Sequence, residues 1–176
     1  MATTYLIVKG WDFVVKNNYF SAFLFESERI LLMLRGADIE DIRMKSKFWR
    51  FQLVDKIYEY FLPPFDRRDM LAIVQNLSYL SFEVYNFIKL NGIKNTAPYN
   101  PEIIGAVTAL HDELAKLNTK KCNILRLKGK AVKLLSVWYG AYKSGVKKEI
   151  CDSLDAIADS YLKFCDALET AVIINS

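Results

Sequence analysis

Apolar residues recur every three or four positions along most of this chain, which is the spacing of one face of an α-helix. The clearest run has apolar side chains at Met70, Ile73, Val74, Leu77, Leu80, Val84, Phe87 and Ile88. The same spacing predicts helices over about 10–35, 38–62, 66–91, 101–118, 121–143 and 147–173. Each helix carries an apolar stripe that must be buried. We therefore expect an all-α fold, an antiparallel helical bundle in a single domain spanning residues 1–176.

The start of the helix predicted at 66 has the strongest local signals. A two-proline turn at 63–64 precedes Asp66, which is placed to act as the N-cap. Asp69 adds negative charge in the first turn, near the positive end of the helix dipole. Phe65 and Met70 have the spacing of a hydrophobic staple over this cap.

Glycine, asparagine and proline mark other helix ends. Gly36 and Gly92 are predicted to stop the helices that precede them. Asn100 is predicted as the N-cap of the next helix, with Pro101 at its first position and Glu102 in its first turn. The segment between Gly92 and Asn100 is predicted to be the only extended loop.

The chain also resembles itself at an offset of about 80 residues. The segment 67–70 aligns with 147–150 in charge, and the apolar positions that follow both segments fall against one another. Val74, Leu77, Val84 and Ile88 align with Leu154, Ile157, Phe164 and Leu168. This pattern predicts two related three-helix units, about 1–92 and 100–176.

Composition restricts the class of protein. The 176 residues are 52% hydrophobic, enough for a core without disulfides or metals, and no apolar run reaches the roughly 20 residues that cross a bilayer. The start of the chain lacks a secretory signal, so we expect a cytoplasmic protein.

Cys122, Cys151 and Cys165 have no metal-site spacing and are interpreted as small buried hydrophobic residues. An aromatic content of 14% favours an interface with a protein partner or with a second copy in a homo-oligomer.

The segment Pro64–Met70, Pro-Phe-Asp-Arg-Arg-Asp-Met, between two apolar helices resembles the PhoU-like phosphate transport regulators, in particular their short, permease-associated branch. The first-helix pattern of that family is matched by Phe20, Phe23, Ser27, Ile30 and Leu34. The resemblance implies a helical bundle that controls phosphate uptake by contact with a membrane phosphate permease. It would then lie in the cytoplasm, peripherally at the inner face of the membrane.

Members of that family carry carboxylates four residues apart, which hold metal ions on one helix face. At the matching positions this chain has Ser78 and Phe82 in the third helix, residues 47–50 around the second-helix position, and the cationic run 126–130 in the fifth. Only Asp155 and Asp159 in the sixth helix keep the spacing, with Asp152 one turn earlier. A solvated surface is the favoured interpretation of these acids, and a weakly bound divalent metal is the alternative. We expect no cofactor.

The densest basic stretch comprises Lys120, Lys121, Arg126, Lys128, Lys130 and Lys133. Arg126, Lys130 and Lys133 share one helical face, and we expect them to be exposed charges. A solvated face is the default interpretation. As an interaction site, the face could meet anionic lipid, an acidic partner or nucleic acid, the last being least favoured because few aromatic residues are interleaved with the charges.

No catalytic constellation is found in the sequence. His111 is the single histidine, and no phosphate-binding glycine loop, dinucleotide fingerprint or paired-histidine motif is present. We therefore expect a protein that acts by binding and not as an enzyme. The alternatives to a PhoU-like regulator are a helical adaptor or scaffold in another pathway, and a weak nucleic-acid-binding bundle.

The departure from the metal motif makes a prediction. Purified protein should lack a stoichiometric multinuclear iron or zinc cluster, since Lys128 and Lys130 would repel a cation. Elemental analysis of protein prepared without chelators measures this. Two or more tightly bound transition ions per chain would contradict it, whereas weak binding of one ion at Asp155 and Asp159 would not.

Overall fold

The structure, a computed structural model, describes residues 19–59, 66–117 and 121–174, and these contain helices and turns but no strand. The helices are α2 (Tyr19–Leu34), α3 (Ile39–Glu59), α4 (Arg67–Asn91), α5 (Ile93–Thr96), α6 (Asn100–Leu114), α7 (Ile124–Lys143) and α8 (Lys148–Ile174). The predicted all-α class is confirmed for this part of the chain. No helix within it is long and apolar enough to cross a membrane.

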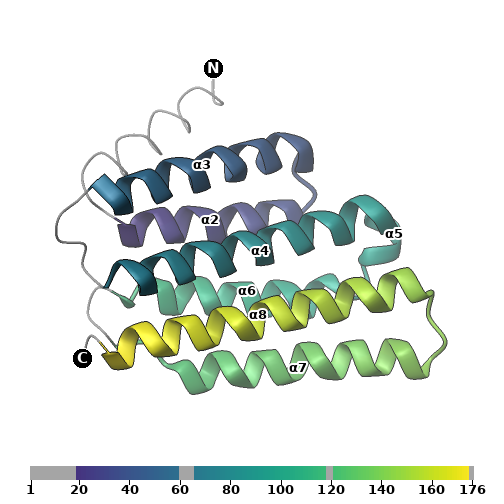
Figure 1. Ribbon diagram of the computed structural model, residues 1–176. Coiled ribbons are helices and arrows are strands. Elements are labelled where there is room, and N and C mark those ends of the chain that lie inside the picture. Colours follow the sequence, from purple (N-terminus) through teal and green to yellow (C-terminus); the bar gives the residue numbers. More distant parts are fainter. Residues whose placement is uncertain (1–18, 60–65, 118–120, 175–176) are drawn as a thin grey trace.

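The long helices lie alongside one another, with α4 and α8 in the middle (Figure 1). The most extensive helix–helix contact is that of α4 with α8; α4 also contacts α2 and α3, while α8 contacts α7. α2 and α6 contact each other on the far side of α4 and α8 in this view. The outer positions are taken by α3 and α7, so each of these two helices has a face without a neighbouring helix in the described part of the chain.

The repeat seen in the sequence corresponds to burial. α4 and α8 begin at Arg67 and Lys148, the two positions where the aligned basic segments lie. All eight aligned apolar side chains are buried, namely Val74, Leu77, Val84, Ile88, Leu154, Ile157, Phe164 and Leu168. Burying a large apolar side chain contributes about 1.5–3 kcal/mol, so these matching stripes stabilise the centre of the bundle.

Most predicted helix boundaries agree with the structure to within a few residues. The first predicted helix, 10–35, is described only from Tyr19, and its residues 10–18 lie outside the described part, as does Phe65 of the predicted staple. The prediction of an extended loop after Gly92 is wrong. Residues Ile93–Thr96 form the short helix α5, because the Gly92 carbonyl accepts hydrogen bonds from the Asn95 and Thr96 amides.

Two short turns explain how consecutive helices reverse direction. Gly36 has φ 88° and Gly145 has φ 67°, conformations that favour glycine. At the first turn the Ala37 amide donates to the Leu32 carbonyl, and at the second the Val146 amide donates to the Ala141 carbonyl. These are Schellman-type endings, and they confirm the predicted stop at Gly36.

The Asp66 cap is confirmed, whereas the Asn100 cap is wrong. One Asp66 carboxylate oxygen accepts from the Arg68 amide at 2.8 Å. Asn100 lies inside α6, whose N-cap position is occupied by Tyr99 without a side-chain bond. The Asn100 side chain donates instead to the Leu34 carbonyl at 3.4 Å, so it ties α6 to the end of α2.

We predict that Asp66→Ala lowers the free energy of unfolding by about 1 kcal/mol, because the α4 amides lose their acceptor. Asp152→Ala is the matched control, since the Asp152 side chain is exposed within α8 and forms no hydrogen bond or ion pair with a described residue. Urea denaturation of both variants measures the difference. Equal stability of Asp66→Ala and the control would contradict the assignment of this cap.

Candidate functional site

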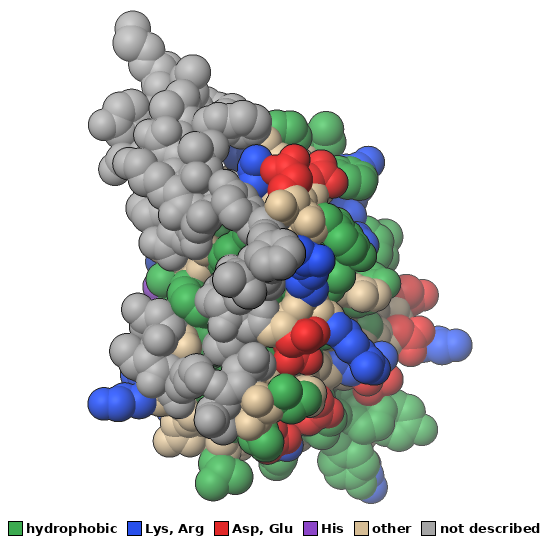
Figure 2. Space-filling model, turned by 60° about the vertical axis from the view of Figure 1, so that its left-hand side comes forward, with side chains coloured by type: hydrophobic (Ala, Val, Ile, Leu, Met, Phe, Trp, Pro, Cys, Tyr) green, Lys and Arg blue, Asp and Glu red, His purple; other side chains and the backbone are tan. Residues whose placement is uncertain are grey.

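The outer helix α7 has two apolar faces. One is buried against the bundle through Leu127, Ala131, Leu134 and Ala141. The other is exposed and consists of Leu125, Val132, Leu135, Tyr139 and Tyr142, which we call the α7 ridge. The ridge lies roughly a third of a turn around the helix from the buried face. Figure 2 shows exposed hydrophobic side chains among charges of both signs on the face of the protein that it displays.

The α7 ridge has the spacing of a helix–helix seam. Its residues are separated by seven, three, four and three positions, which is the repeat of a coiled-coil a/d pattern. Lys128 stands at the remaining position of the pattern and is held down by Glu169 of α8, with Nζ to Oε2 at 2.6 Å. A second helix could therefore lie along the ridge, with Lys128 turned toward its own bundle.

Two glycines of α7 have no internal packing role. Gly129 and Gly140 lie within α7, and a Cβ added to either would meet nothing within 4 Å in the structure. Glycine within a helix costs about 0.5–1 kcal/mol relative to alanine, so internal stability does not account for these two residues. They are suited to close approach of another backbone.

The carboxyl-terminal end of the ridge is aromatic and held by neighbours. The rings of Trp138 and Tyr142 stack with centroids 6.2 Å apart, and the Lys143 ammonium lies 5.5 Å from the centre of the Tyr139 ring. Tyrosines with an apolar ring and a free hydroxyl are common at protein interfaces. Since both rings are already held, little side-chain entropy is lost when a partner contacts them.

The basic residues predicted as an interaction site have three different environments. Arg126 is exposed, as expected, and it is also paired: its guanidinium lies 2.9 Å from a Glu113 oxygen and 3.0 Å from an Asp112 oxygen. Lys130 extends over α6, with its Nζ 3.8 Å from the place of a Cβ on Gly105. Lys133 is exposed and forms no ion pair with the described residues. Within the described residues, Arg126 is thus the one of the three that forms an ion pair, and Lys130 and Lys133 form none.

Glu113 is a completely buried carboxylate that joins α6 to the start of α7. Its oxygens accept from the Asn123 amide at 2.7 Å, from Lys116 at 2.9 Å and from Arg126. Burial opposes ionisation, but these hydrogen bonds outweigh it and lower the pKa of Glu113 below its usual 4.5. The position where α7 begins is therefore fixed by charge as well as by packing.

The predicted metal residues Asp155 and Asp159 are exposed on α8. Asp159 is paired with Lys163, with Oδ2 to Nζ at 2.6 Å. Within residues 19–59, 66–117 and 121–174, no group of three or more histidine, cysteine, aspartate or glutamate side chains is arranged to hold a metal ion.

The cysteines are buried or half-buried, and the histidine forms a hydrogen bond between two helices. Cys151 and Cys165 are buried and Cys122 is half-buried. Burial raises the pKa of the Cys122 thiol to about 11 and that of Cys165 to about 12, so neither is a reactive thiolate at neutral pH. His111 Nδ1 lies 2.9 Å from Ser27 Oγ, which itself donates to the Leu24 carbonyl, and this hydrogen bond links α6 to α2.

Comparisons with known proteins add no relative. No protein-family model matches the chain, and no curated protein or solved structure is significantly similar to it. The sequence did contain the signal for the α7 ridge, since the heptad spacing from Leu125 to Tyr142 is visible in it. Because basic residues are interleaved with these apolar positions, the sequence analysis interpreted this helix by its charges and missed the apolar ridge.

We predict that Glu113→Gln lowers the free energy of unfolding at neutral pH by about 1.5–3 kcal/mol, because its hydrogen bonds to charged groups are weakened. A carboxylate with a lowered pKa stabilises the fold above its unfolded pKa, and that contribution is lost as the pH falls through the folded pKa. The variant should therefore lose less stability than the parent below about pH 4.5. Urea denaturation across pH 3–7 measures this, and parallel curves would contradict it.

Proposed function

We propose that this protein is a non-enzymatic, PhoU-like regulator that binds the cytoplasmic side of a membrane phosphate permease through the α7 ridge. The observation that carries the proposal is an apolar seam with helix-pairing spacing on an outer helix. The same helix contains two glycines, Gly129 and Gly140, that the bundle itself does not need.

The arrangement of the helices supports the family part of the proposal. α2, α3 and α4 contact one another, and α7 contacts both α6 and α8; these two groups are joined by α4 with α8, the most extensive contact, and by α2 with α6. We interpret these groups as the two units of a PhoU-like bundle. The Asp66 cap belongs to the sequence segment on which the resemblance rests.

The chemistry of the ridge suggests what the partner surface is like. A surface that buries Val132, Leu135 and Tyr139 must itself be apolar, and the glycines favour a helix that approaches closely. Exposed lysines without an ion pair in the described part of the chain lie on α7, in the turn after it and at the start of α8, namely Lys133, Lys143, Lys147 and Lys148. The matching partner is an apolar helix flanked by acidic residues, as a cytoplasmic loop of a permease can supply.

This proposal predicts the effect of two ridge substitutions. Val132→Ser with Tyr139→Ser should weaken binding to detergent-solubilised membranes more than about tenfold, because two anchors of the seam are lost. The fold should be kept, since both side chains are largely exposed, at 62% and 52%. Pull-down with tagged protein, followed by mass spectrometry, measures the permease recovered. Phosphate uptake in a strain that carries only the variant should resemble uptake in a deletion strain.

The matched control is Met44→Ser with Phe48→Ser on α3, where the side chains are 67% and 55% exposed. It removes similar apolar area from the other outer helix and should leave recovery and uptake unchanged. Equal loss with both double variants would contradict ridge-specific docking. Unchanged phosphate uptake, with no permease in the pull-down, would favour the hypothesis of a helical adaptor in another pathway. If the tagged protein recovers only untagged copies of itself, the ridge is a self-association surface.

A further inference from the structure

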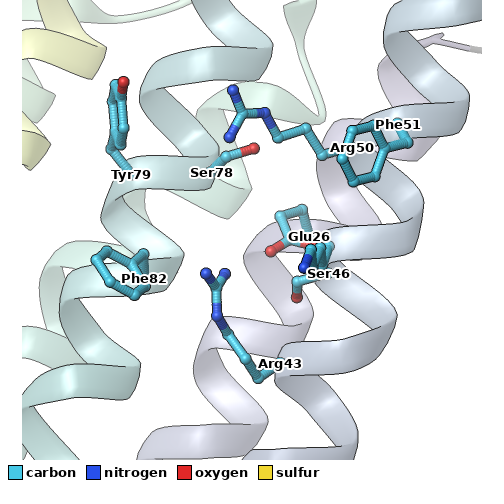
Figure 3. A pocket seen from close by; sticks show the side chains of 9 residues that line it. Glu26, Arg43, Ser46, Arg50, Phe51, Ser78, Tyr79 and Phe82 are labelled. Atoms are coloured by element: carbon cyan, nitrogen blue, oxygen red, sulfur yellow. The ribbon is translucent and has the colours of Figure 1, made fainter.

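A pocket of about 270 Å³ lies between α2, α3 and α4 (Figure 3). α3 and α7 lie at opposite edges of the bundle (Figure 1). The polar lining of the pocket comes from Glu26 of α2, from Arg43, Ser46, Lys47 and Arg50 of α3, and from Ser78 of α4. Phe51, Tyr79 and Phe82 add aromatic walls.

Three basic side chains of α3 face the pocket, and none of them is paired with a carboxylate of the described part of the chain. Arg43, Lys47 and Arg50 follow one another at spacings of four and three, which puts them on one helical face. None forms an ion pair with a residue of the described part. Arg43 is held in place by rings, with its guanidinium carbon 4.6 Å from the centre of Phe82 and 5.7 Å from that of Tyr85. Figure 3 shows the guanidinium groups of Arg43 and Arg50 extended toward α4.

The inner side of the pocket holds buried polar atoms that the protein does not satisfy. Glu26 is completely buried, and its Oε2 lies 3.1 Å from Arg29 Nη1. Its Oε1, like Ser46 Oγ and Ser78 Oγ, has no hydrogen-bond partner in the described structure. Buried polar atoms in native proteins are nearly always paired, and an unpaired one costs about 1–3 kcal/mol. Of the unpaired buried side-chain atoms in the described part, Trp49 Nε1, Ser81 Oγ and Asn100 Oδ1 do not belong to pocket residues, but the other three line this one pocket. Their concentration in one pocket points to a ligand.

The other half of the bundle provides an internal comparison. Glu113 of α6 is equally buried and has a cation three residues on, Lys116, as Glu26 has Arg29. Glu113 is saturated, because Arg126 and the Asn123 amide reach it from the start of the next helix. Glu26 receives no such second group. The protein thus supplies hydrogen-bond donors to both oxygens of the buried Glu113 carboxylate, whereas one oxygen of Glu26, beside the pocket, has none.

We infer that this pocket binds a small tetrahedral oxyanion that carries a proton, the chemistry shared by hydrogen phosphate and the singly protonated form of a phosphomonoester. Arg43, Lys47 and Arg50 pair with the anionic oxygens, and the two serine hydroxyls donate to them. The O–H of the ligand donates to Glu26 Oε1, which would repel an anion without a proton. Arg29 neutralises Glu26, so the three α3 cations give the pocket its positive charge.

The role of Glu26 implies selection between similar ions. Hydrogen phosphate and sulfate are alike in shape, but sulfate has no proton at neutral pH and leaves the Glu26 oxygen unpaired next to a negative charge. The inference goes beyond docking, as it gives the regulator a ligand to respond to. It rests on residues of α2, α3 and α4 and not on α7, so either proposal can fail while the other stands.

Isothermal titration calorimetry of the full chain at constant ionic strength tests the inference with three probes, namely inorganic phosphate, phenyl phosphate and sulfate. We expect saturable binding of at least one phosphate probe and at least tenfold weaker binding of sulfate. Tighter binding of inorganic phosphate would identify the free ion as the ligand. Tighter binding of phenyl phosphate would identify a phosphorylated metabolite that uses the aromatic walls. Absence of saturable phosphate binding at millimolar concentrations, or equal binding of sulfate, would overturn the inference.

Two sets of variants locate the site. Lys47→Gln with Arg50→Gln should weaken phosphate binding at least tenfold, whereas Lys133→Gln with Lys143→Gln, which removes the same charge from α7, should not change it. Equal losses would show a general charge effect and overturn the inference. Glu26→Gln should bring the affinities for phosphate and sulfate close together, because the amide can donate to either ion. Thermal melts measure whether Glu26→Gln, which changes a buried residue, is folded. If it is unfolded, Ser78→Ala is the second test: it leaves Glu26 unchanged and should weaken phosphate binding.

Discussion

The packing of α4 against α8 is the contact on which the remaining structure depends. These are the two longest helices, and each presents an apolar stripe with the same spacing, so the side chains of the two stripes are buried together. This pairing leaves α2 and α6 to cover the other side of the centre and places α3 and α7 outermost. An outer helix needs only one apolar face for folding. Where it has a second one, as α7 does, stability does not explain that face.

Two buried carboxylates connect this architecture to the proposed functions. Glu113 is surrounded by donors and fixes where α7 starts, which in turn orients the ridge. Glu26 occupies a similar place in the first half of the chain but keeps one oxygen without a partner beside a cation-lined pocket. One carboxylate therefore serves the fold, and the other is better explained by a ligand. Removing the first should cost stability, and altering the second should change selectivity.

The sequence predicted the helices well because apolar periodicity and helix caps are local properties. Asp66, Gly36 and the aligned stripes of α4 and α8 were all readable without a structure. What failed depended on contacts between distant segments. Asn100 has the chemistry of an N-cap but binds the end of α2. Arg126 is exposed, as expected, but its pairing with a buried carboxylate on α6 was not predicted. The pocket was not predicted, since Glu26, Arg50 and Ser78 come from three helices and no spacing along the chain joins them.

The central claim is that the α7 ridge is the surface through which this protein meets a permease, and site-specific photo-crosslinking in living cells tests it most directly. Benzoylphenylalanine at position 139 keeps an aromatic ring at the ridge, and the same residue at position 48 on α3 is the matched site. The account predicts a crosslinked product between position 139 and a permease subunit, with none from position 48. Crosslinks from position 48 alone, or products from position 139 that contain only copies of this chain, would contradict it.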